Sequence, residues 1–359
     1  MANGVKRVGI LTGGGDCPGL NAAIRAVVKA GVGIYNLEIY GIETGFEGLI
    51  KKYARPLNLE EVRGIVNKGG TILGATRRHD PFHYQERAGE EIKTMDRSGD
   101  ILQHASELGL DALVVLGGDG TLRIAERLSQ MGLPLVAIPK TIDNDLSGTD
   151  VAIGFNTAVI TAMEALDKLH STAESHHRVM VVEVMGNKAG WIGLESGIAG
   201  GADVILIPEI PFSIEKACEK ITGRTKLGRP FSIVVVSEGA KALGREETYI
   251  DPKRYRLGGI GQQIAAEIEK CAGLETRVLV LGHLQRGGSP TSFDRVLASR
   301  FAIHALRLIA QGNFGKMVAL RNAEVQAIPI ETAIASLKTV DPNDDLASTA
   351  EALGISLGR

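Results

Sequence analysis

The chain has 359 residues, of which 44% are hydrophobic and 23% are charged, and its net charge is −2. This balance is that of an ordinary globular protein. It excludes the strongly basic surface that favours binding to nucleic acid or to an anionic membrane. The length exceeds what one core usually holds, so we expect two domains of roughly 150 to 200 residues each.

Glycine and cysteine usage narrows the class of protein further. The 45 glycines gather at strand-to-helix turns, which is typical of an α/β enzyme with many ligand loops. The cysteines Cys17, Cys218 and Cys271 have neither metal-ligand spacing nor a disulfide pattern, so a reducing cytoplasm is expected. We expect no signal peptide, and no apolar run approaches the ~20 residues of a membrane span.

The first part of the chain contains two glycine-rich turns. A strand is predicted over Val5–Leu11, followed by the turn TGGGDCPGLN and a helix over Leu20–Ala30. The second turn, KGGTILGATRR, ends in Arg77 and Arg78, which alone could be a solvated charge pair. The polar segment His79–Asp100 is predicted to be helical with loops.

The centre of the chain has the pattern of a βαβ unit. Ala112–Leu116 is a short run of Val and Leu, as in a strand buried on both faces. It stops at GGDGT, and apolar residues at helical spacing then run to a glycine that would end a helix. A second buried run, Leu133–Ile138, follows, which favours a parallel sheet.

The two loops of this unit carry the residues that phosphoryl transfer needs. The GGDGT loop lets backbone N–H groups and a helix N-terminus approach a phosphate, and Asp119 is suited to Mg²⁺ riding on phosphates. Asp143 and Asp145, at spacing two, would point the same way in an extended segment. A cradle, a metal ligand and a spare carboxylate base suit transfer to an alcohol. The glycine loop alone is also compatible with a tight turn that binds nothing.

Strand ends in the second half of the chain repeat one pattern, an apolar run followed by a polar residue. His283 and Arg286 follow such a run beside glycines, which suits a sugar phosphate, although a lone histidine is more often structural. Strands and helices alternate throughout, and this alternation predicts an α/β fold of two doubly wound, Rossmann-like domains with mostly parallel sheets.

Several motifs together resemble the 6-phosphofructokinase family. GGDGT alone also resembles NAD kinases and diacylglycerol kinases, but PKTIDND, MGNKAGW, SEGA and GHLQRGGSP extend the resemblance to the phosphofructokinases over nearly the whole chain. The resemblance implies phosphorylation of fructose 6-phosphate by ATP with Mg²⁺. It also implies a homotetramer with active sites shared between subunits, and domains at 1–154 plus 285–335 and 155–284 plus 336–359, with the active site in the cleft between them.

The resemblance also implies a role for each matching residue. Asp143 would be the general base, and Asp119, helped by Asp145, would hold Mg²⁺. Thr141 and Gly15 would donate hydrogen bonds to the transferred phosphoryl group. The nucleotide and its phosphates would contact Gly15, Arg77, Arg78, Gly118, Asp119, Gly120 and Thr121. Fructose 6-phosphate would contact Thr141, Ile142, Asp143, Arg178, Met185, Gly186, Asn187, Glu238, Arg277, His283, Leu284, Gln285 and Arg286. Arg178 and Arg277 would come from a neighbouring subunit.

The phosphoryl donor depends on Gly120 and Lys140. Pyrophosphate-dependent relatives usually have Asp and Lys at these positions, whereas ATP-dependent bacterial relatives usually have two glycines, so this chain is mixed. A carboxylate at 120 would crowd and repel the α-phosphate, and Gly120 therefore favours ATP. Pyrophosphate is the alternative donor. A catalytically silent, nucleotide-binding subunit is a further alternative, which the presence of all three aspartates disfavours.

Overall fold

The structure, a computed structural model, describes residues 4–76, 80–88, 91–251 and 256–359. It separates into two compact units. The first consists of Met1–Thr141, Leu146–Gly154 and Arg286–Leu337, and the second of Ile142–Asp145, Phe155–Gln285 and Lys338–Arg359. The short segment Ile142–Asp145, which carries Asp143, belongs with the second unit, whereas the predicted boundaries kept it in the first.

An eight-stranded sheet forms the centre of the first unit, in the order β16-β15-β7-β6-β1-β2-β3, with β8 pairing β7. Its strands β1, β2, β6, β7, β8 and β15 pair in parallel, and β3 and β16 are antiparallel to their neighbours. The bounds are β1 (Arg7–Thr12), β2 (Glu38–Ile42), β3 (Ala54–Leu57), β6 (Ala112–Gly117), β7 (Leu135–Thr141), β8 (Ile153–Gly154), β15 (Lys316–Arg321) and β16 (Glu324–Pro329).

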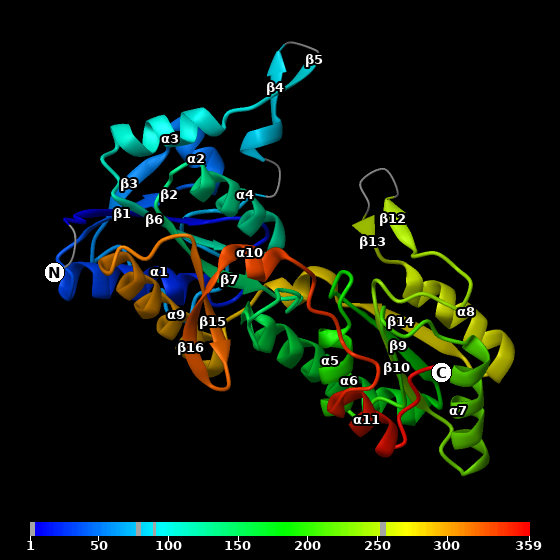
Figure 1. The fold of residues 1–359 in the computed structure, drawn as a ribbon. Coiled ribbons are helices and arrows are strands. Elements are labelled where there is room, and N and C mark those ends of the chain that lie inside the picture. Colours follow the sequence, from blue (N-terminus) through cyan, green and yellow to red (C-terminus); the bar gives the residue numbers. More distant parts are fainter. Residues whose placement is uncertain (1–3, 77–79, 89–90, 252–255) are drawn as a thin grey trace. The chain divides into compact units, whose positions relative to one another are not determined.

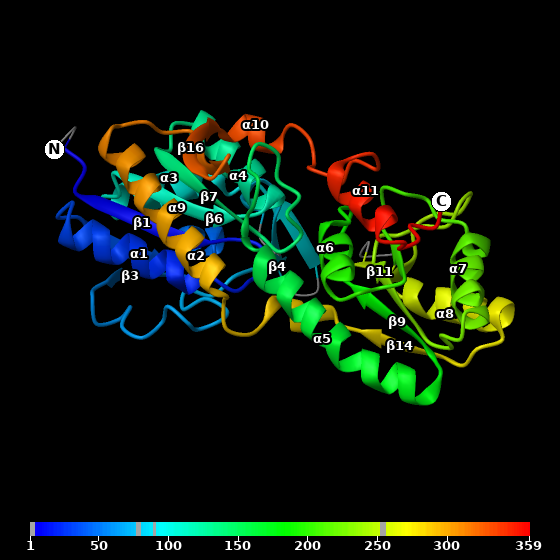
Figure 2. The same cartoon turned by 90° about the horizontal axis from the view of Figure 1, so that it is seen from below.

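Helices cover both faces of this sheet (Figure 1). On one face, α2 (Phe46–Lys51), α3 (Ser98–Glu107), α4 (Asp119–Gln130) and α10 (Ile330–Ile334) pack into one apolar core with the strands. On the other, α1 (Leu20–Gly33) and α9 (Ser292–Ala310) lie side by side (Figure 2). Every residue of β6 and β7 is buried, which explains why both strands read as continuous apolar runs.

The second unit contains a four-stranded parallel sheet in the order β10-β11-β9-β14. Its strands are β9 (Val179–Val184), β10 (Val204–Leu206), β11 (Ser232–Ser237) and β14 (Thr276–Val280). Helices α7 (Ile214–Lys226) and α8 (Ile260–Ala272) share a core with one face. Helices α5 (Phe155–His176) and α6 (Trp191–Ala199) contact the sheet away from that core, and α11 (Asp345–Ala352) packs on α6. A short antiparallel pair, β12 (Tyr249–Asp251) and β13 (Arg256–Leu257), precedes α8.

The expectation that no disulfide forms is wrong. Cys218 on α7 and Cys271 on α8 are disulfide-bonded, with their Cα atoms 6.2 Å apart. The two residues are separated by 53 positions in sequence, so no spacing rule indicates the pair. They meet because α7 and α8 pack side by side in the second unit. Cys17 is free and buried, and burial raises the pKa of its thiol to about 12.

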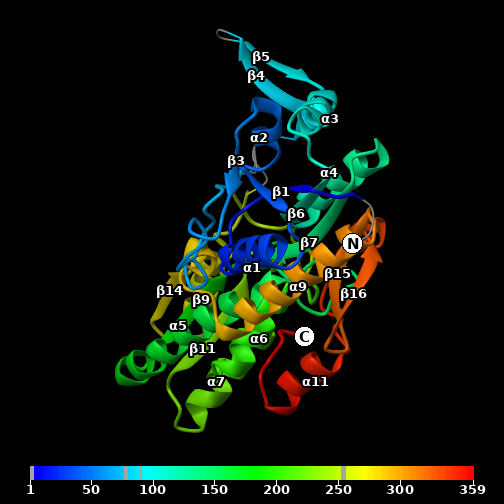
Figure 3. The ribbon, with the colours of Figure 1, turned by 90° about the vertical axis from the view of Figure 1, so that its left-hand side faces the viewer.

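The helix predicted between residues 79 and 100 is also wrong. After a short 3-10 turn (Pro81–His83), β4 (Tyr84–Ala88) and β5 (Glu91–Met95) form an antiparallel hairpin that extends from the first unit (Figure 3). Helix α3 begins only at Ser98. The strand-forming residues Tyr84, Ile92 and Thr94 are a signal for β-structure that the high charge of the segment concealed.

Candidate active site

Two glycine-rich loops, after β1 and after β6, meet at the carboxyl ends of these neighbouring strands, and β7 lies next to β6 in the same sheet. Thr121, buried at the start of α4, lies at the meeting point. A Cβ added to Gly117 would lie 2.3 Å from the Thr121 side chain, and one added to Gly13 would lie 2.5 Å from it. Glycine is therefore needed at both positions for close packing. β2 lies on one side of β1 and β6 lies on the other, so the strand order reverses between β1 and β6, which is the point in such sheets where ligands bind.

Lys140 connects the last of these strands to the first loop. Its side chain is buried, and its Nζ donates a hydrogen bond to the Gly15 carbonyl at 2.5 Å. A Cβ added to Gly14 would lie 3.4 Å from this Nζ, and Gly14 has a left-handed φ of 76°. The ammonium group of Lys140 thus positions the 13–16 loop, in addition to placing a positive charge beside it.

The start of α4 has the features of a phosphate-binding helix N-terminus. The N-cap residue is Gly118, which supplies no side-chain cap. A Cβ added to Gly120 would meet nothing within 4 Å, so the fold itself does not require glycine there. Asp119 is partly exposed and accepts a hydrogen bond from Arg123 Nε at 2.9 Å, one turn along the helix. Thr141, the last residue of β7, is buried.

The second glycine turn is anchored to the first by the side chain of Asn21, for which the sequence predicted no role. The Asn21 amide donates to the carbonyls of Lys68 and Gly69 at 3.1 Å, and its Oδ1 accepts from Ile72 N at 2.8 Å. Asn21 is almost completely buried, and a polar residue on the apolar face of a predicted helix was the available signal. Arg77 and Arg78, which end this turn, lie outside the described residues.

In the second unit, the predicted sugar-binding residues after β9 and β11 lie together. Glu238, directly after β11, accepts a hydrogen bond from Asn187 N at 3.1 Å. Gly186 and Asn187 both have positive φ, which turns the chain sharply after Met185. A Cβ added to Gly239 would lie 2.1 Å from the Asn187 carbonyl oxygen, so the two loops are in direct contact.

The segment after β14 reaches the same end of the second sheet. Leu281 N donates to the carbonyl of Glu183, a β9 residue, at 3.0 Å. The following short helix, Gly282–Arg286, contains His283, Leu284 and Gln285. Gln285 is fully buried and donates to the Gly282 carbonyl at 3.2 Å, which holds this turn closed. Arg286, at the start of the next first-unit segment, is buried and donates to the Asp16 carbonyl at 3.3 Å.

Arg178 and Arg277 lie at the opposite end of the second sheet. Arg178 immediately precedes β9, and Arg277 is the second residue of β14, whereas Met185 follows β9 and His283 follows β14. Arg178 Nε donates to Glu275 at 2.6 Å, Arg277 also pairs with Glu275, and the hydrogen bond from Arg178 lowers the pKa of that carboxyl. The structure therefore does not bring these arginines to the other predicted sugar ligands of the same chain.

The loop Ile142–Asp145 carries the predicted base. Ile142 and Asp145 are buried, Asp143 is partly exposed, and Asn144 adopts a left-handed φ of 52°. The carbonyl of Asp145 accepts a hydrogen bond from Lys338 N at 2.8 Å. Among the residues that the structure describes, no group of three or more His, Cys, Asp or Glu side chains could hold a metal without help.

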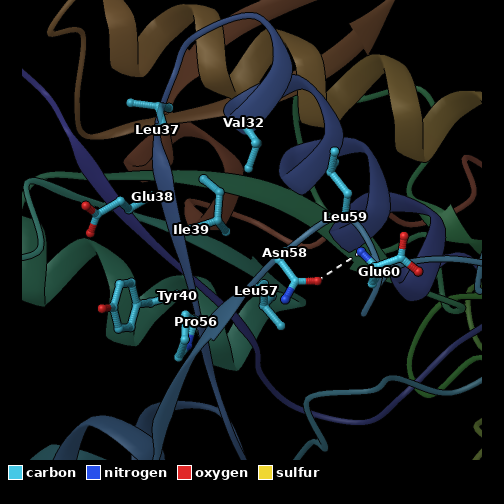
Figure 4. Close-up of a pocket in the computed structure, with 10 residues that line it drawn as sticks. All are labelled: Val32, Leu37, Glu38, Ile39, Tyr40, Pro56, Leu57, Asn58, Leu59 and Glu60. Carbon is cyan, nitrogen blue, oxygen red and sulfur yellow. Dashed lines mark hydrogen bonds between the residues drawn. The ribbon is translucent and has the colours of Figure 1, made fainter.

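A further pocket lies on the first unit, away from these loops (Figure 4). Its volume is about 590 Å³, and it is lined mainly by apolar side chains of α1, β2, β3 and the turn after β3. The turn is closed by a 2.9 Å hydrogen bond from Glu60 N to Asn58 Oδ1. The pocket contains none of the predicted site residues. In the described part of the chain, no helix is both long and apolar enough to cross a membrane.

Residues 7–309 match the family model described as phosphofructokinase. The chain belongs to the phosphofructokinase family. The ATP-dependent 6-phosphofructokinase of Chloroflexus aurantiacus is 49% identical over 359 residues, which cover 100% of this chain and 99% of the relative. The pyrophosphate–fructose 6-phosphate 1-phosphotransferase of Streptomyces coelicolor is 49% identical over 342 residues, which cover 94% of this chain and 96% of the relative.

A solved phosphofructokinase has the same fold. The crystal structure of Pichia pastoris phosphofructokinase in the T-state matches 98% of this chain with a TM-score of 0.80 and 32% identity. This chain spans 37% of that longer chain. The predicted α/β class and family membership are thereby confirmed.

Proposed function

We propose that this phosphofructokinase transfers the terminal phosphoryl group of ATP to the 1-hydroxyl of fructose 6-phosphate, giving fructose 1,6-bisphosphate and ADP in glycolysis. The observation that carries the proposal is the convergence of two glycine-rich loops on Thr121, at the carboxyl ends of the adjacent parallel strands β1 and β6. Full-length relatives named as ATP-dependent 6-phosphofructokinases support it. As a glycolytic enzyme it would be cytoplasmic.

The donor would be bound mainly by backbone groups of the first unit. Gly15, Gly118 and Gly120 allow N–H groups to approach phosphate oxygens, and the N-terminus of α4 adds the positive end of its dipole. Thr121 keeps these loops together. Arg77 and Arg78 are proposed to contact the transferred phosphate and the nucleoside, as the resemblance implies.

Magnesium fits the residues at the start of α4. Asp119 offers an oxygen ligand, and a magnesium ion held by one or two carboxylates together with substrate phosphates needs no larger protein cluster. We propose that Asp119, supported by Asp145, holds the ion and that Arg123 pairs with Asp119 in its absence. When bound, Mg²⁺ neutralises charge on the donor phosphates.

The acceptor would be activated by Asp143. Its carboxylate would take the proton of the 1-hydroxyl as that oxygen attacks the phosphorus. Asp143 follows Thr141, the last residue of β7, by two positions, and two residues span at most about 7 Å. The base is therefore held near the end of β7 by the chain itself. Ile142, Met185, Gly186, Asn187, Glu238, His283, Leu284, Gln285 and Arg286 are proposed to hold the sugar phosphate.

A homotetramer with shared sites is proposed on the position of two arginines. Arg178 and Arg277 lie at the amino ends of their strands, so one chain cannot easily bring them to a sugar bound at the carboxyl ends. A neighbouring chain could supply them, as the family resemblance implies. The edge strand β14 also exposes Leu279 and Val280, an apolar edge that proteins normally cover.

Pyrophosphate remains the second candidate donor. Lys140 and the Streptomyces coelicolor relative favour it, whereas the open space at Gly120 and the relatives named as ATP-dependent favour ATP. The test is an assay of purified protein with fructose 6-phosphate and Mg²⁺, offered ATP or pyrophosphate in turn. Fructose 1,6-bisphosphate formed with ATP supports the proposal. Fructose 1,6-bisphosphate formed with pyrophosphate but not with ATP would support the pyrophosphate-dependent reaction instead. No product with either donor would reject both reactions.

A further inference from the structure

A short C-terminal segment, Lys338–Val340, bridges two loops of the second unit. Lys338 N donates to the carbonyl of Asp145, at the end of the loop that carries Asp143, at 2.8 Å. The Lys338 carbonyl accepts from Trp191 Nε1 at 2.9 Å, and the Lys338 ammonium lies 5.6 Å from the centre of the Trp191 ring. Trp191 is the first residue of α6, directly after the loop Met185–Gly190.

Glu209 makes the same connection a second time. Its Oε1 accepts from Gly190 N and from Val340 N, both at 2.9 Å. Its Oε2 is buried and receives no hydrogen bond from the described part of the chain. Burial raises the pKa of this carboxyl, and the two backbone N–H groups act in the opposite direction. Glu209 thus joins the Met185–Gly190 loop to the C-terminal segment, and burying its carboxylate costs desolvation energy.

The loop has little room to move against Glu209. A Cβ added to Gly190 would lie 2.5 Å from Ile207 Cβ and 2.7 Å from Glu209 Oε2, so the backbone of Gly190 is in direct contact with both residues. At the other end of the loop, Asn187 N is held by Glu238. The loop that would contact the sugar is thus fixed at both ends.

We propose that Glu209, Trp191 and Lys338–Val340 form a positioning clamp, which fixes the Ile142–Asp145 loop relative to the Met185–Gly190 loop. The inference rests on the proposed function, because it assigns the base to the first loop and the sugar to the second. The clamp residues are positioning residues and need not touch substrate. Their effect on turnover follows from geometry, since misplacing a reacting group by about 1 Å can lower the rate about 100-fold.

The test compares Glu209→Ala with Glu209→Gln. The alanine variant loses the acceptor for both N–H groups, and we expect kcat to fall about 10- to 100-fold while KM for ATP stays within twofold. Glutamine keeps one acceptor oxygen, and kcat should stay within about threefold of the original. The matched control is Asp203→Asn, because Asp203 is also buried and accepts from Ile233 N at 3.0 Å, but at the amino end of β10. It should lower the unfolding temperature without changing kcat.

A second readout is independent of catalysis. Trp191 is the only tryptophan of the chain, so its fluorescence reports on the clamp alone. Glu209→Ala should shift its emission to longer wavelength and increase its quenching by acrylamide, and Glu209→Gln should do neither. If the original protein transfers no phosphoryl group, the proposed function fails while this comparison still tests the clamp. A Glu209→Ala protein with unchanged kcat and unchanged fluorescence would overturn the clamp.

A further variant covers the case in which Glu209→Ala does not fold. Trp191→Phe keeps an aromatic ring, although a smaller one than indole, and removes the Nε1–H donor to Lys338. We expect it to fold, to lower kcat about fivefold and to leave KM for ATP unchanged. Kinetics identical to those of the original protein in this variant would overturn the clamp in its turn.

Discussion

The two units present different kinds of surface at the carboxyl ends of their parallel strands. In the first, the loops after β1 and β6 are glycines packed against one threonine, and the groups offered to a ligand are mostly backbone N–H. In the second, the side chains of Glu209 and Glu238 fix the loops by accepting hydrogen bonds from the backbone N–H groups of Gly190 and Asn187. Backbone recognition suits the repeated phosphates of a nucleotide, and side-chain recognition suits a sugar with many distinct hydroxyls.

This difference predicts how substitutions in the two units will separate. Changes at the glycine loops should alter the choice and binding of the donor and leave the acceptor largely unaffected. Changes in the second unit should alter turnover and sugar binding. Asp143→Asn, Gly120→Asp and Arg277→Ala test this separation, and Cys271→Ser tests a difference in stability between the two units.

Asp143→Asn should give the largest loss. The amide has the shape of the carboxylate but cannot accept the proton of the 1-hydroxyl, and general bases contribute about 10²- to 10⁴-fold. We expect kcat to fall about 1,000-fold, with KM for ATP within threefold of the original value. Steady-state kinetics with both substrates measure the two constants. An Asp143→Asn enzyme with more than one tenth of the original kcat would remove Asp143 from the role of base.

Cys271→Ser tests how much the disulfide stabilises the second unit. The disulfide to Cys218 closes a loop of 53 positions in the second unit, and bonds of this kind typically contribute about 2–4 kcal/mol. We expect unfolding of the second unit, followed by Trp191 fluorescence in urea, to lose stability in this range without reductant. With reductant, the original protein and the variant should coincide.

Thiol counting provides an independent control for the same prediction. The buried Cys17 thiol, whose pKa burial raises to about 12, should not react with an aromatic disulfide reagent in the native protein. The untreated protein should therefore release no thiol signal until it is reduced or unfolded. Immediate reaction of one or two thiols in untreated protein would contradict the pairing.

Gly120→Asp tests donor recognition in the first unit. The added side chain meets open space, so the variant should fold normally, but its carboxylate would repel the phosphates of ATP. We expect kcat/KM for ATP to fall about 100-fold, which corresponds to about 2.7 kcal/mol. Gly120→Asn is the matched control, with the same shape and no charge. If both variants lose activity equally, the loss comes from the size of the added side chain and not from charge repulsion.

The sequence indicated the residues of each loop better than their surroundings. The βαβ unit around GGDGT was predictable because buried parallel strands leave continuous apolar runs, as β6 and β7 do. The pairing of Cys218 with Cys271 and the hydrogen bonds of Glu209 depend on packing between segments far apart in sequence, which periodicity cannot reveal. The β4–β5 hairpin was missed because charged residues masked its strand formers.

Arg277→Ala should give the smallest effect and tests whether neighbouring chains complete the second unit's site. Arg277 is half-exposed and forms an ion pair with Glu275. Binding a phosphate would break this ion pair, so the net gain from Arg277 is small. We therefore expect KM for fructose 6-phosphate to rise only about tenfold. Arg277→Ala is then mixed with Asp143→Asn under conditions that exchange subunits. If sites are shared, some mixed sites contain both an intact Asp143 and an intact Arg277, and activity at low sugar concentration rises above that of either parent. No increase, with subunit exchange verified by native mass spectrometry, would place both residues in one chain's own site and would contradict the shared arrangement.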